Sequence, residues 1–355
     1  MSEPVSVTEA TPAPRRRGAS PLQLLLGLTV SAVAIWLLLR QVDLRLVGQA
    51  LGQARLPLLL LAPVAYFVSM SLRAWRWTFL LRPIKRLGWR DVWPVTALGY
   101  AGNLVLPARL GEVLRAAVMR SRGVSAGSAL ATIAAERMID GLATVAIALF
   151  TMRLLPESAP AWLISAGRVA AVVFGAGLVV LFVMLLARPL VERILDSLSA
   201  RVHWLAKPAG WALRFLDGLA VLRSPALLAQ ILAVTAVAWV ASIAEYWLVM
   251  AAMGIRLPAA GAAFSISAIG LSSAIPAAPG YVGTQELVGV TMLGLWGVPA
   301  EAALAASLAF HVIEIVPIGL VGLVVAWREG ILGPRRAASP LGLESAVAGS
   351  GDDPA

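Results

Sequence analysis

Charged side chains stand inside several long apolar stretches of this sequence. Glu136, Arg137 and Asp140 lie within the apolar run 128–152. A charge at the centre of a membrane-spanning helix costs about 2.5–3.5 kcal/mol on insertion scales, so each one needs a reason. Spacings of three and four residues put these side chains near one another on a helix. Arg137 can neutralise one carboxylate and leave the other for a substrate amine or a proton; the alternative is a structural ion pair that locks helices together.

Two stretches combine apolar residues with residues that break helices. They read GYAGNLVLPARLGEVLRAAVMR from Gly99 and GLSSAIPAAPGYVGTQE from Gly270. Broken backbone at membrane depth is tolerated only where it lines a polar cavity or is buried in protein, and paired breaks are a sequence pointer to a transport site. The alternative is two kinked helices that only pack. The candidate hinges are Pro107, Gly111, Pro276, Gly280 and Gly283.

Charged residues follow the first of these breaks. Glu112 and Arg115 are three residues apart just past it. A helix that begins near Gly111 would place Glu112 at its positive end and let Arg115 face the cavity. Because arginine donates bidentately to phosphate, Arg109 and Arg115 are the leading candidates to bind one. The alternative role for Arg109 is to anchor the chain at the membrane face where basic residues gather.

Other apolar stretches hold further candidates. Arg73 and Arg76 are flanked by tryptophans, a pattern most often used to anchor a helix at the membrane interface, with a ligand role as the alternative. Glu286 opens the helix after the second break. His311 and Glu314 are three residues apart and share a helix face. Two ligands are too few for a metal site, so a His–Glu hydrogen bond or proton relay fits better.

The composition excludes a soluble globular protein. Hydrophobic residues make up 59% of the 355 residues and charged residues 14%, with a mean hydropathy of +0.84. A soluble domain carries about a quarter charged residues. The apolar residues form long runs and do not alternate, which predicts a helical membrane protein and not a β-barrel. The net charge of +10 comes from basic residues that flank these runs, which fits anionic lipid headgroups better than nucleic acid.

Several kinds of chemistry find no support in the sequence. It contains no cysteine and only two histidines, which excludes disulfides and leaves little for a metal site. No phosphate-binding P-loop, nucleophile elbow or H-E-x-x-H motif occurs. We therefore expect no metal, no cofactor and no ATP-driven step.

The apolar runs define the predicted membrane spans, because a spanning helix needs about 20 apolar residues. They cover 22–39, 56–81, 128–152, 162–187, 226–253 and 302–327, with two broken apolar regions at 91–118 and 259–299. The sequence predicts an all-α polytopic membrane protein with about eight transmembrane segments in pseudo-repeated halves. The two broken regions are either full spans or re-entrant hairpins.

Basic clusters orient these spans. They precede the first run, follow the second, precede the third and follow the fourth and the last, which predicts that both termini are cytoplasmic in a plasma (inner) membrane. Residues 188–224 alternate apolar and charged residues at helical spacing, so we expect an amphipathic segment along the cytoplasmic face. The polar tails 1–18 and 333–355 are predicted to be disordered and to flank a membrane domain at 19–332.

Five segments carry a resemblance to a known family: RAWRWTFLL (73–81), GNLVLPARLGEVLRAAVM (102–119), ATIAAERMIDGLATVAI (131–147), SSAIPAAPGYVGTQE (272–286) and AFHVIEIVPIGLVGLVV (309–325). Together they resemble the transmembrane region of the lysylphosphatidylglycerol synthase family, which includes flippase-like membrane proteins. The resemblance covers most of the chain and implies a domain that moves a lipid between leaflets. In full synthases a soluble domain transfers an amino acid from charged tRNA. The sequence ends soon after its last apolar run, so lysyl transfer is not expected.

These observations support one hypothesis and leave two alternatives. The favoured activity is translocation of an anionic or aminoacylated phospholipid, or of a polyprenyl-phosphate-linked lipid, and not catalysis. The alternatives are a membrane glycosyl- or acyltransferase and a scaffold subunit for a partner enzyme. The partners would be membrane lipids, with a homo-oligomer or a partner synthase also open. The residues expected at the headgroup cavity are Arg73, Arg76, Arg109, Glu112, Arg115, Glu136, Arg137, Asp140, Glu286, His311 and Glu314.

Overall fold

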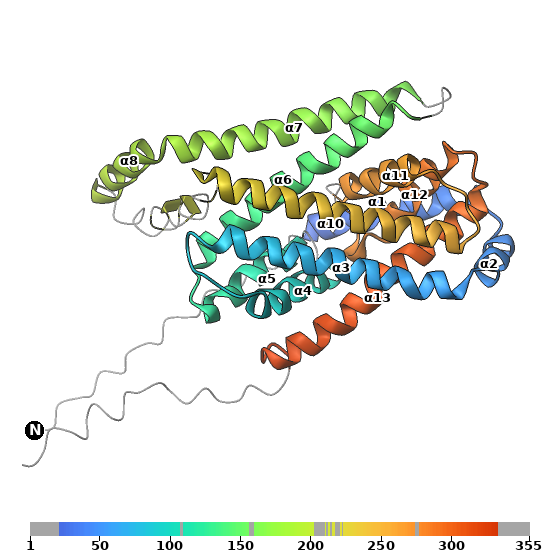
Figure 1. Ribbon diagram of the computed structural model, residues 1–355, viewed down its shortest axis with the longest axis horizontal. Helices are drawn as coiled ribbons and strands as arrows, with labels where there is room; N and C mark the ends of the chain where they lie inside the picture. The colour runs from blue at the N-terminus through green and yellow to red at the C-terminus, as the bar shows by residue number, and fades with distance from the viewer. Residues whose placement is uncertain are drawn as a thin grey trace, which may run out of the picture.

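The protein was analysed as a computed structural model, which describes residues 21–106, 109–155, 160–201, 210, 212–213, 215–216, 221, 223–273 and 277–332. Within this part of the chain all regular structure is helical, which confirms the all-α prediction (Figure 1). The main helices are α1 (Pro21–Leu39), α2 (Leu44–Gly52), α3 (Leu56–Leu81), α4 (Trp89–Val105), α5 (Leu110–Met119), α6 (Ala126–Met152), α7 (Ala161–Leu186), α8 (Arg188–Arg201), α10 (Pro225–Ala252), α11 (Ala259–Ser272), α12 (Thr284–Gly294) and α13 (Ala300–Arg328). The short turns η2 (Arg120–Arg122) and η5 (Pro279–Tyr281) join them.

Six long helices cover the six predicted apolar runs. At 1.5 Å per residue, the 26 residues of α3 extend about 39 Å, more than the about 30 Å of a bilayer's hydrocarbon core. By length and apolarity, α3, α10, α13 and residues 165–184 of α7 qualify as membrane spans. Their outward faces expose large apolar side chains, including Val172, Val240 and Leu320, as contact with lipid requires. The chain is a multi-pass membrane protein.

The two broken regions form helical hairpins. At 1.5 Å per residue, the 17 residues of α4 and the 10 of α5 extend about 25 and 15 Å, too short to cross a bilayer. Arg122, just past α5, donates to the main-chain oxygen of Asp91 near the start of α4, at 3.0 Å, so α5 returns to the face from which α4 came. Likewise α11 and α12 have 14 and 11 residues, and Trp296, just past α12, lies against Gly261 near the start of α11.

The two hairpins enter from opposite faces of the bundle. The preceding helices, α3 and α10, pack antiparallel: the main chain of Arg55 bonds to Ala252 at 2.8 Å, and Arg82 donates to Gln230 at 3.4 Å near the other end. The hairpins that follow them therefore begin at opposite ends, as Figure 1 shows for α4 and α5 against α11 and α12. Each half of the chain thus runs long helix, hairpin, long helix, in opposite directions, which is an inverted repeat.

Two apolar cores stabilise the ends of the bundle. One gathers the end of α3, α5 and the start of α6 around Trp77, which is fully buried. The other gathers the end of α10 and the start of α13 around Tyr246 and Phe310, whose rings meet edge to face at 5.0 Å. Some of the charged residues predicted from the sequence directly adjoin core residues in the chain, as Arg76 adjoins Trp77 and His311 adjoins Phe310.

The basic loops share one face, which we call the basic face: residues 82–90, 120–125 and 328–330. Arg122 ties them together, because it forms an ion pair with Glu329 and its carbonyl accepts from Lys85 at 2.8 Å. The predicted tails 1–18 and 333–355 lie outside the described residues, as does most of the predicted amphipathic segment beyond α8.

Candidate functional site

The charged residues of α3, α5 and α6 form one buried cluster. Arg76 is fully buried and donates to both carboxylate oxygens of Asp140, at 2.5 and 2.8 Å, and to the hydroxyl of Thr235, at 3.0 Å. It also lies 3.5 Å from Glu136. This bidentate geometry uses both terminal nitrogens of the guanidinium and fixes α3 against α6, while Nε has no hydrogen-bond partner among the described residues.

Arg115 completes the cluster from the first hairpin. Its guanidinium donates to Glu136 at 3.1 Å and stacks over the ring of Trp77, 4.0 Å from its centroid. Room for this side chain comes from Gly99 on α4, where a Cβ would lie 2.2 Å from Arg115. Trp77 supplies both packing and a cation–π contact, so Arg115 holds α5 against α3 and α6.

Arg137 bridges the three carboxylates of the cluster. It lies 2.9 Å from Glu136 and 3.7 Å from both Asp140 and Glu112. Its side chain keeps 22% of its surface exposed, so it forms the accessible edge of the cluster. Four arginines face three carboxylates, which leaves one excess positive charge: Arg73, Arg76, Arg115 and Arg137 against Glu112, Glu136 and Asp140.

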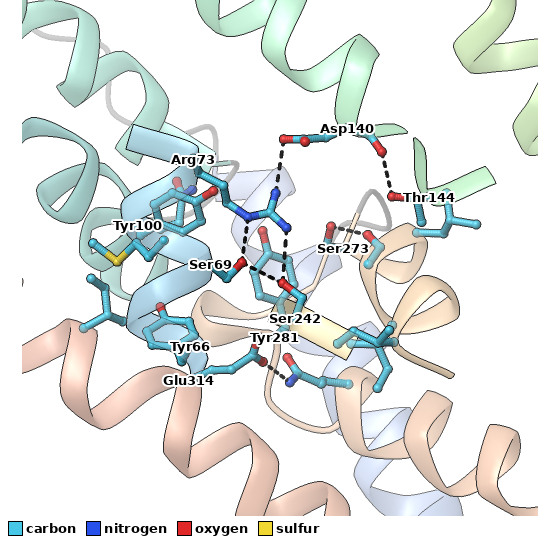
Figure 2. A pocket seen from close by; sticks show the side chains of 18 of the residues that line it. Tyr66, Ser69, Arg73, Tyr100, Asp140, Thr144, Ser242, Ser273, Tyr281 and Glu314 are labelled. Atoms are coloured by element: carbon cyan, nitrogen blue, oxygen red, sulfur yellow. Dashed lines mark hydrogen bonds and ion pairs between the residues drawn. The ribbon is translucent and has the colours of Figure 1, made fainter. Parts of the chain in front are cut away.

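A cavity of about 290 Å³ adjoins this cluster. It is lined by Arg73, Arg137 and Asp140 of the cluster, by Arg109 at the tip of the first hairpin, and by tyrosine, serine and glutamate side chains of both halves. Figure 2 shows Arg73 directed to Asp140, Ser69 and Ser242, with Glu314 on the opposite side. The distances to Arg73 are 3.4 to 3.5 Å, so these contacts are loose enough to be exchanged for a ligand.

The tips of the two hairpins meet beside the cavity. Arg109 has a left-handed backbone, with φ of 56°, and donates to the hydroxyls of Tyr281, at 3.1 Å, and Ser273, at 3.0 Å. Tyr281 is itself left-handed, with φ of 59°. Such conformations cost about 1–3 kcal/mol in residues other than glycine and concentrate at functional sites. At the second tip, Gly280 and Gly283 have positive φ, which glycine adopts readily, and this agrees with their prediction as helix breaks.

The second half contributes the carboxylate end of the site. Glu286 accepts from the main chain of Gly283 at 2.7 Å and pairs with Nδ1 of His311. Nε2 of His311 donates to the carbonyl of Gly280 at 2.7 Å, because a carbonyl can only accept. Glu314 accepts from Gln285 at 2.7 Å. The bond from Gly283 caps α12, and the bonds of His311 and Glu314 hold the second hairpin to α13.

The structure divides the predicted site residues into two sets. Arg73, Arg109, Arg137, Asp140, His311 and Glu314 line the cavity. Arg76, Glu112, Arg115, Glu136 and Glu286 do not line it and serve the ion pairs and caps behind it.

Two interpretations of these residues were wrong. Arg76 is not an interfacial anchor, since it is fully buried and paired within the protein. The hydrogen-bond partner of His311 is Glu286, not Glu314, because the second hairpin folds back against α13.

The predicted hinges are only partly described. Pro107 and Pro276 lie outside the described residues. Gly111 belongs to α5 and is not itself a break; a Cβ there would lie 2.1 Å from the carbonyl of Gly99, so its role is the close packing of α5 on α4.

The cavity also contains residues that sequence reasoning did not select. Hydroxyl side chains in apolar helices, such as Ser69, Ser242 and Tyr66, look like ordinary helix-packing residues in a sequence. Glu245 on α10 also lines the cavity, and its charge within an apolar helix was the signal that could have included it. Among the described residues no group of three side chains could hold a metal ion.

This arrangement defines a class of protein: a polytopic helical membrane protein whose two oppositely entering hairpins meet at a charged cavity. The chain matches the family of the lysylphosphatidylglycerol synthase TM region over residues 24–322 and belongs to that family, which confirms the resemblance. A curated relative is glycosyltransferase AglD of Haloferax volcanii, 29% identical over 324 residues. The match covers 81% of this chain and 51% of the relative, so the chain spans about half the length of the relative that it matches.

Proposed function

We propose that the protein translocates a phosphate-bearing lipid between membrane leaflets, either a phospholipid or a polyprenyl-phosphate-linked lipid. The observation that carries this proposal is the cavity where the two hairpin tips meet, because three arginines line it: Arg73 of α3, Arg137 of α6 and Arg109 at the first tip. The cluster behind them has an excess positive charge that an anionic headgroup would balance. Family membership supports the same activity.

The dimensions of the cavity favour a headgroup as the translocated part. Ligand pockets enclose about 300–1,000 Å³, and this cavity of about 290 Å³ holds a phosphate with a small substituent but no acyl chains. The chains would remain in the lipid along the exposed apolar helix faces. Hairpins that do not span the membrane allow the site to face either leaflet with small movements of their tips. We further propose that the membrane is the plasma (inner) membrane and that the basic face is cytoplasmic.

The test is lipid movement in proteoliposomes that hold the purified protein. Headgroup-labelled phosphatidylglycerol and polyprenyl phosphate would be supplied in one leaflet and their exchange followed. Arg109 is the best residue to change, because it lines the cavity without belonging to the ion-pair cluster. We expect Arg109→Gln to slow translocation by at least about tenfold, the loss of one charge-assisted hydrogen bond, and Arg109→Lys to restore part of the rate.

The matched control is Arg86→Gln, which removes a positive charge from the basic face and not from the cavity. Its translocation rate should equal that of the wild type. Folded wild-type protein that moves neither lipid would refute the proposal, and equal slowing by both variants would mean that Arg109 acts only through surface charge.

A second candidate rests on the similarity to a glycosyltransferase. In this version the cavity holds a polyprenyl phosphate while a sugar is transferred to it, either by this chain or by a partner enzyme. Incubation of the reconstituted protein with polyprenyl phosphate and radiolabelled nucleotide sugars tests it. Labelled lipid that forms without leaflet exchange would favour this candidate over translocation.

A further inference from the structure

We propose that Glu245 and Glu314 form a proton-carrying site at the carboxylate end of the cavity, so that one proton crosses with each lipid anion. This inference rests on the proposed lipid translocation and adds its driving force. It follows from the placement of the two carboxylates within one cavity and from one oxygen atom of Glu245 that has no hydrogen-bond partner in the described part of the chain.

Glu245 is the group that requires an explanation. It lies on α10, only 2% exposed, one helical turn beyond Ser242, and it lines the cavity. Its Oε1 atom has no hydrogen-bond partner among the described residues. An ionised carboxylate buried without a donor costs several kcal/mol. The oxygen therefore either carries a proton or awaits a cation in the cavity.

Glu314 places a second carboxylate at the same end. It extends from α13 into the cavity, held by Gln285 at 2.7 Å, and its charge acts directly on Glu245. Two neighbouring carboxylates in a nonpolar site do not ionise together without a cation, because their repulsion adds to the desolvation of each. A proton bound between them is the smallest charge that removes this repulsion.

The remaining titratable and charged groups around the cavity offset the two carboxylates only in part. Arg73 is the arginine that acts on both carboxylates, and it already contacts Asp140 and two serines. His311 also lines the cavity and its charge would act on Glu314, but its Nδ1 atom is paired with Glu286. The others come from α3, α4, α5, α6 and η5 and are Tyr66, Tyr100, Arg109, Arg137 and Tyr281. Tyr66 interacts electrostatically with both carboxylates, but a neutral phenol brings no positive charge. Among the described residues no hydrogen bond or ion pair joins any of these five side chains to Glu245 or Glu314.

Phosphate binding and proton binding would then support each other. A lipid phosphate at Arg73 offsets the positive charge that otherwise stabilises ionised Glu245 and Glu314, so the two carboxylates hold a proton more tightly when the lipid is bound. By linkage, the proton must equally tighten lipid binding. The lipid anion and the proton would move together as a neutral pair, which is a symport.

The first measurement needs no lipid movement. Infrared difference spectroscopy of the solubilised protein, with and without a short-chain phosphatidylglycerol, reports the C=O stretch of a protonated carboxylic acid. We expect the lipid to increase this band in the wild type, and Glu245→Gln to remove the increase. Glu301→Gln, at the first turn of α13 and outside the cavity, should leave it unchanged. A wild-type spectrum without any such change would overturn the proposal.

The second measurement is transport against a gradient. With one proton carried per phosphatidylglycerol anion, a gradient of about one pH unit should give about tenfold accumulation of the labelled lipid in the acceptor leaflet. An imposed potassium diffusion potential should change nothing, because the pair is neutral. In Glu245→Gln and Glu314→Gln the accumulation ratio should fall to one.

The outcomes separate the two proposals. Lipid that moves at a rate and to a ratio independent of pH would overturn proton coupling and leave translocation standing. A lipid-dependent infrared band that Glu245→Gln removes, with no lipid movement in any leaflet, would retain the proton site and refute translocation. Accumulation that follows a sodium gradient would assign the carboxylates to a metal cation. If Glu245→Gln does not elute as a single species in size-exclusion chromatography, Glu245→Asp replaces it as the test variant. Because Glu245→Asp keeps the carboxyl group, it should retain the lipid-dependent infrared band.

Discussion

Replacing Asp140 with asparagine tests whether the buried charges act as one structural unit. Asp140 accepts from Arg76 at 2.5 and 2.8 Å and lies 3.4 Å from Arg73. Asparagine keeps the shape but has one acceptor oxygen and no charge. The cluster would then hold four arginines against two carboxylates. Breaking a buried pair on one side costs about 3–5 kcal/mol, and we expect a loss of about 3, because Glu136 still lies 3.5 Å from Arg76.

Reversible unfolding in mixed detergent micelles measures this loss. The matched control is Asp91→Asn, which removes the same charge where Asp91 accepts from the exposed main chain of Gly88, at 3.0 Å. That cap is worth about 1 kcal/mol. A loss for Asp140→Asn no larger than that of the control would refute the view that the cluster stabilises the fold.

A double variant separates charge balance from lost packing. Arg76→Gln added to Asp140→Asn restores the excess of one positive charge. The double variant should therefore lose less free energy of unfolding than the sum of the losses in the two single variants. Residues in direct contact typically couple by about 0.5–3 kcal/mol. Additivity within about 0.3 kcal/mol would mean that the two side chains stabilise the protein independently, contrary to their bidentate geometry.

Two further predictions concern the hairpins. Gly111→Ala should lower the free energy of unfolding by about 1–3 kcal/mol, because its Cβ would lie 2.1 Å from the carbonyl of Gly99 and force α5 away from α4. Thermal unfolding measures this loss, with Gly48→Ala as the control, since a Cβ at Gly48 would have nothing within 4 Å and should not destabilise the protein. Equal effects of the two variants would contradict the argument. Tyr281→Phe removes one hydrogen bond from Arg109, which contributes about 0.5–1.5 kcal/mol. The rate of amide hydrogen exchange at both hairpin tips should therefore rise by up to about tenfold. An unchanged rate would mean that the tips are held by packing alone.

The membrane helices could be predicted because their signal is local. An apolar run longer than the bilayer is thick has one plausible conformation, and the six long helices end within two residues of the predicted limits. Whether the two broken regions form full spans or hairpins could not be predicted from a local signal. It depends on where each helix restarts after the break, and Leu110 and Thr284 restart helices of only 10 and 11 residues. Nothing in the composition of those segments sets that length.

The partners of the charged side chains depended on tertiary structure. Spacing placed Glu136, Arg137 and Asp140 together because they share α6, and the structure keeps them in contact. Spacing also paired His311 with Glu314, whereas the nearer acceptor, Glu286, arrives from another helix. Arg76 shows the same limit. Its tryptophan neighbours are typical of an interface, but its acceptors on α6 and α10 lie 64 and 159 residues away in the chain.

The distribution of these contacts indicates where the bundle can open. Within the membrane region that the structure describes, the ion pairs join elements of the same half: Arg115 of α5 to Glu136 of α6 in the first, and Glu286 of α12 to His311 of α13 in the second. The polar contacts between the halves beside the cavity are hydrogen bonds that involve hydroxyl groups, as from Arg109 to Tyr281, and apolar packing of α4 on α13 adds to them.

These two kinds of contact differ in what they cost to break. A neutral hydrogen bond contributes about 1 kcal/mol and water or a ligand can replace it, whereas an unpaired buried charge costs about 3–5 kcal/mol. The packed antiparallel helices α3 and α10 remain as a fixed axis between the halves. The least costly contacts to break when the cavity opens are therefore the hydrogen bonds between the two hairpin tips, while the ion pairs within each half remain intact.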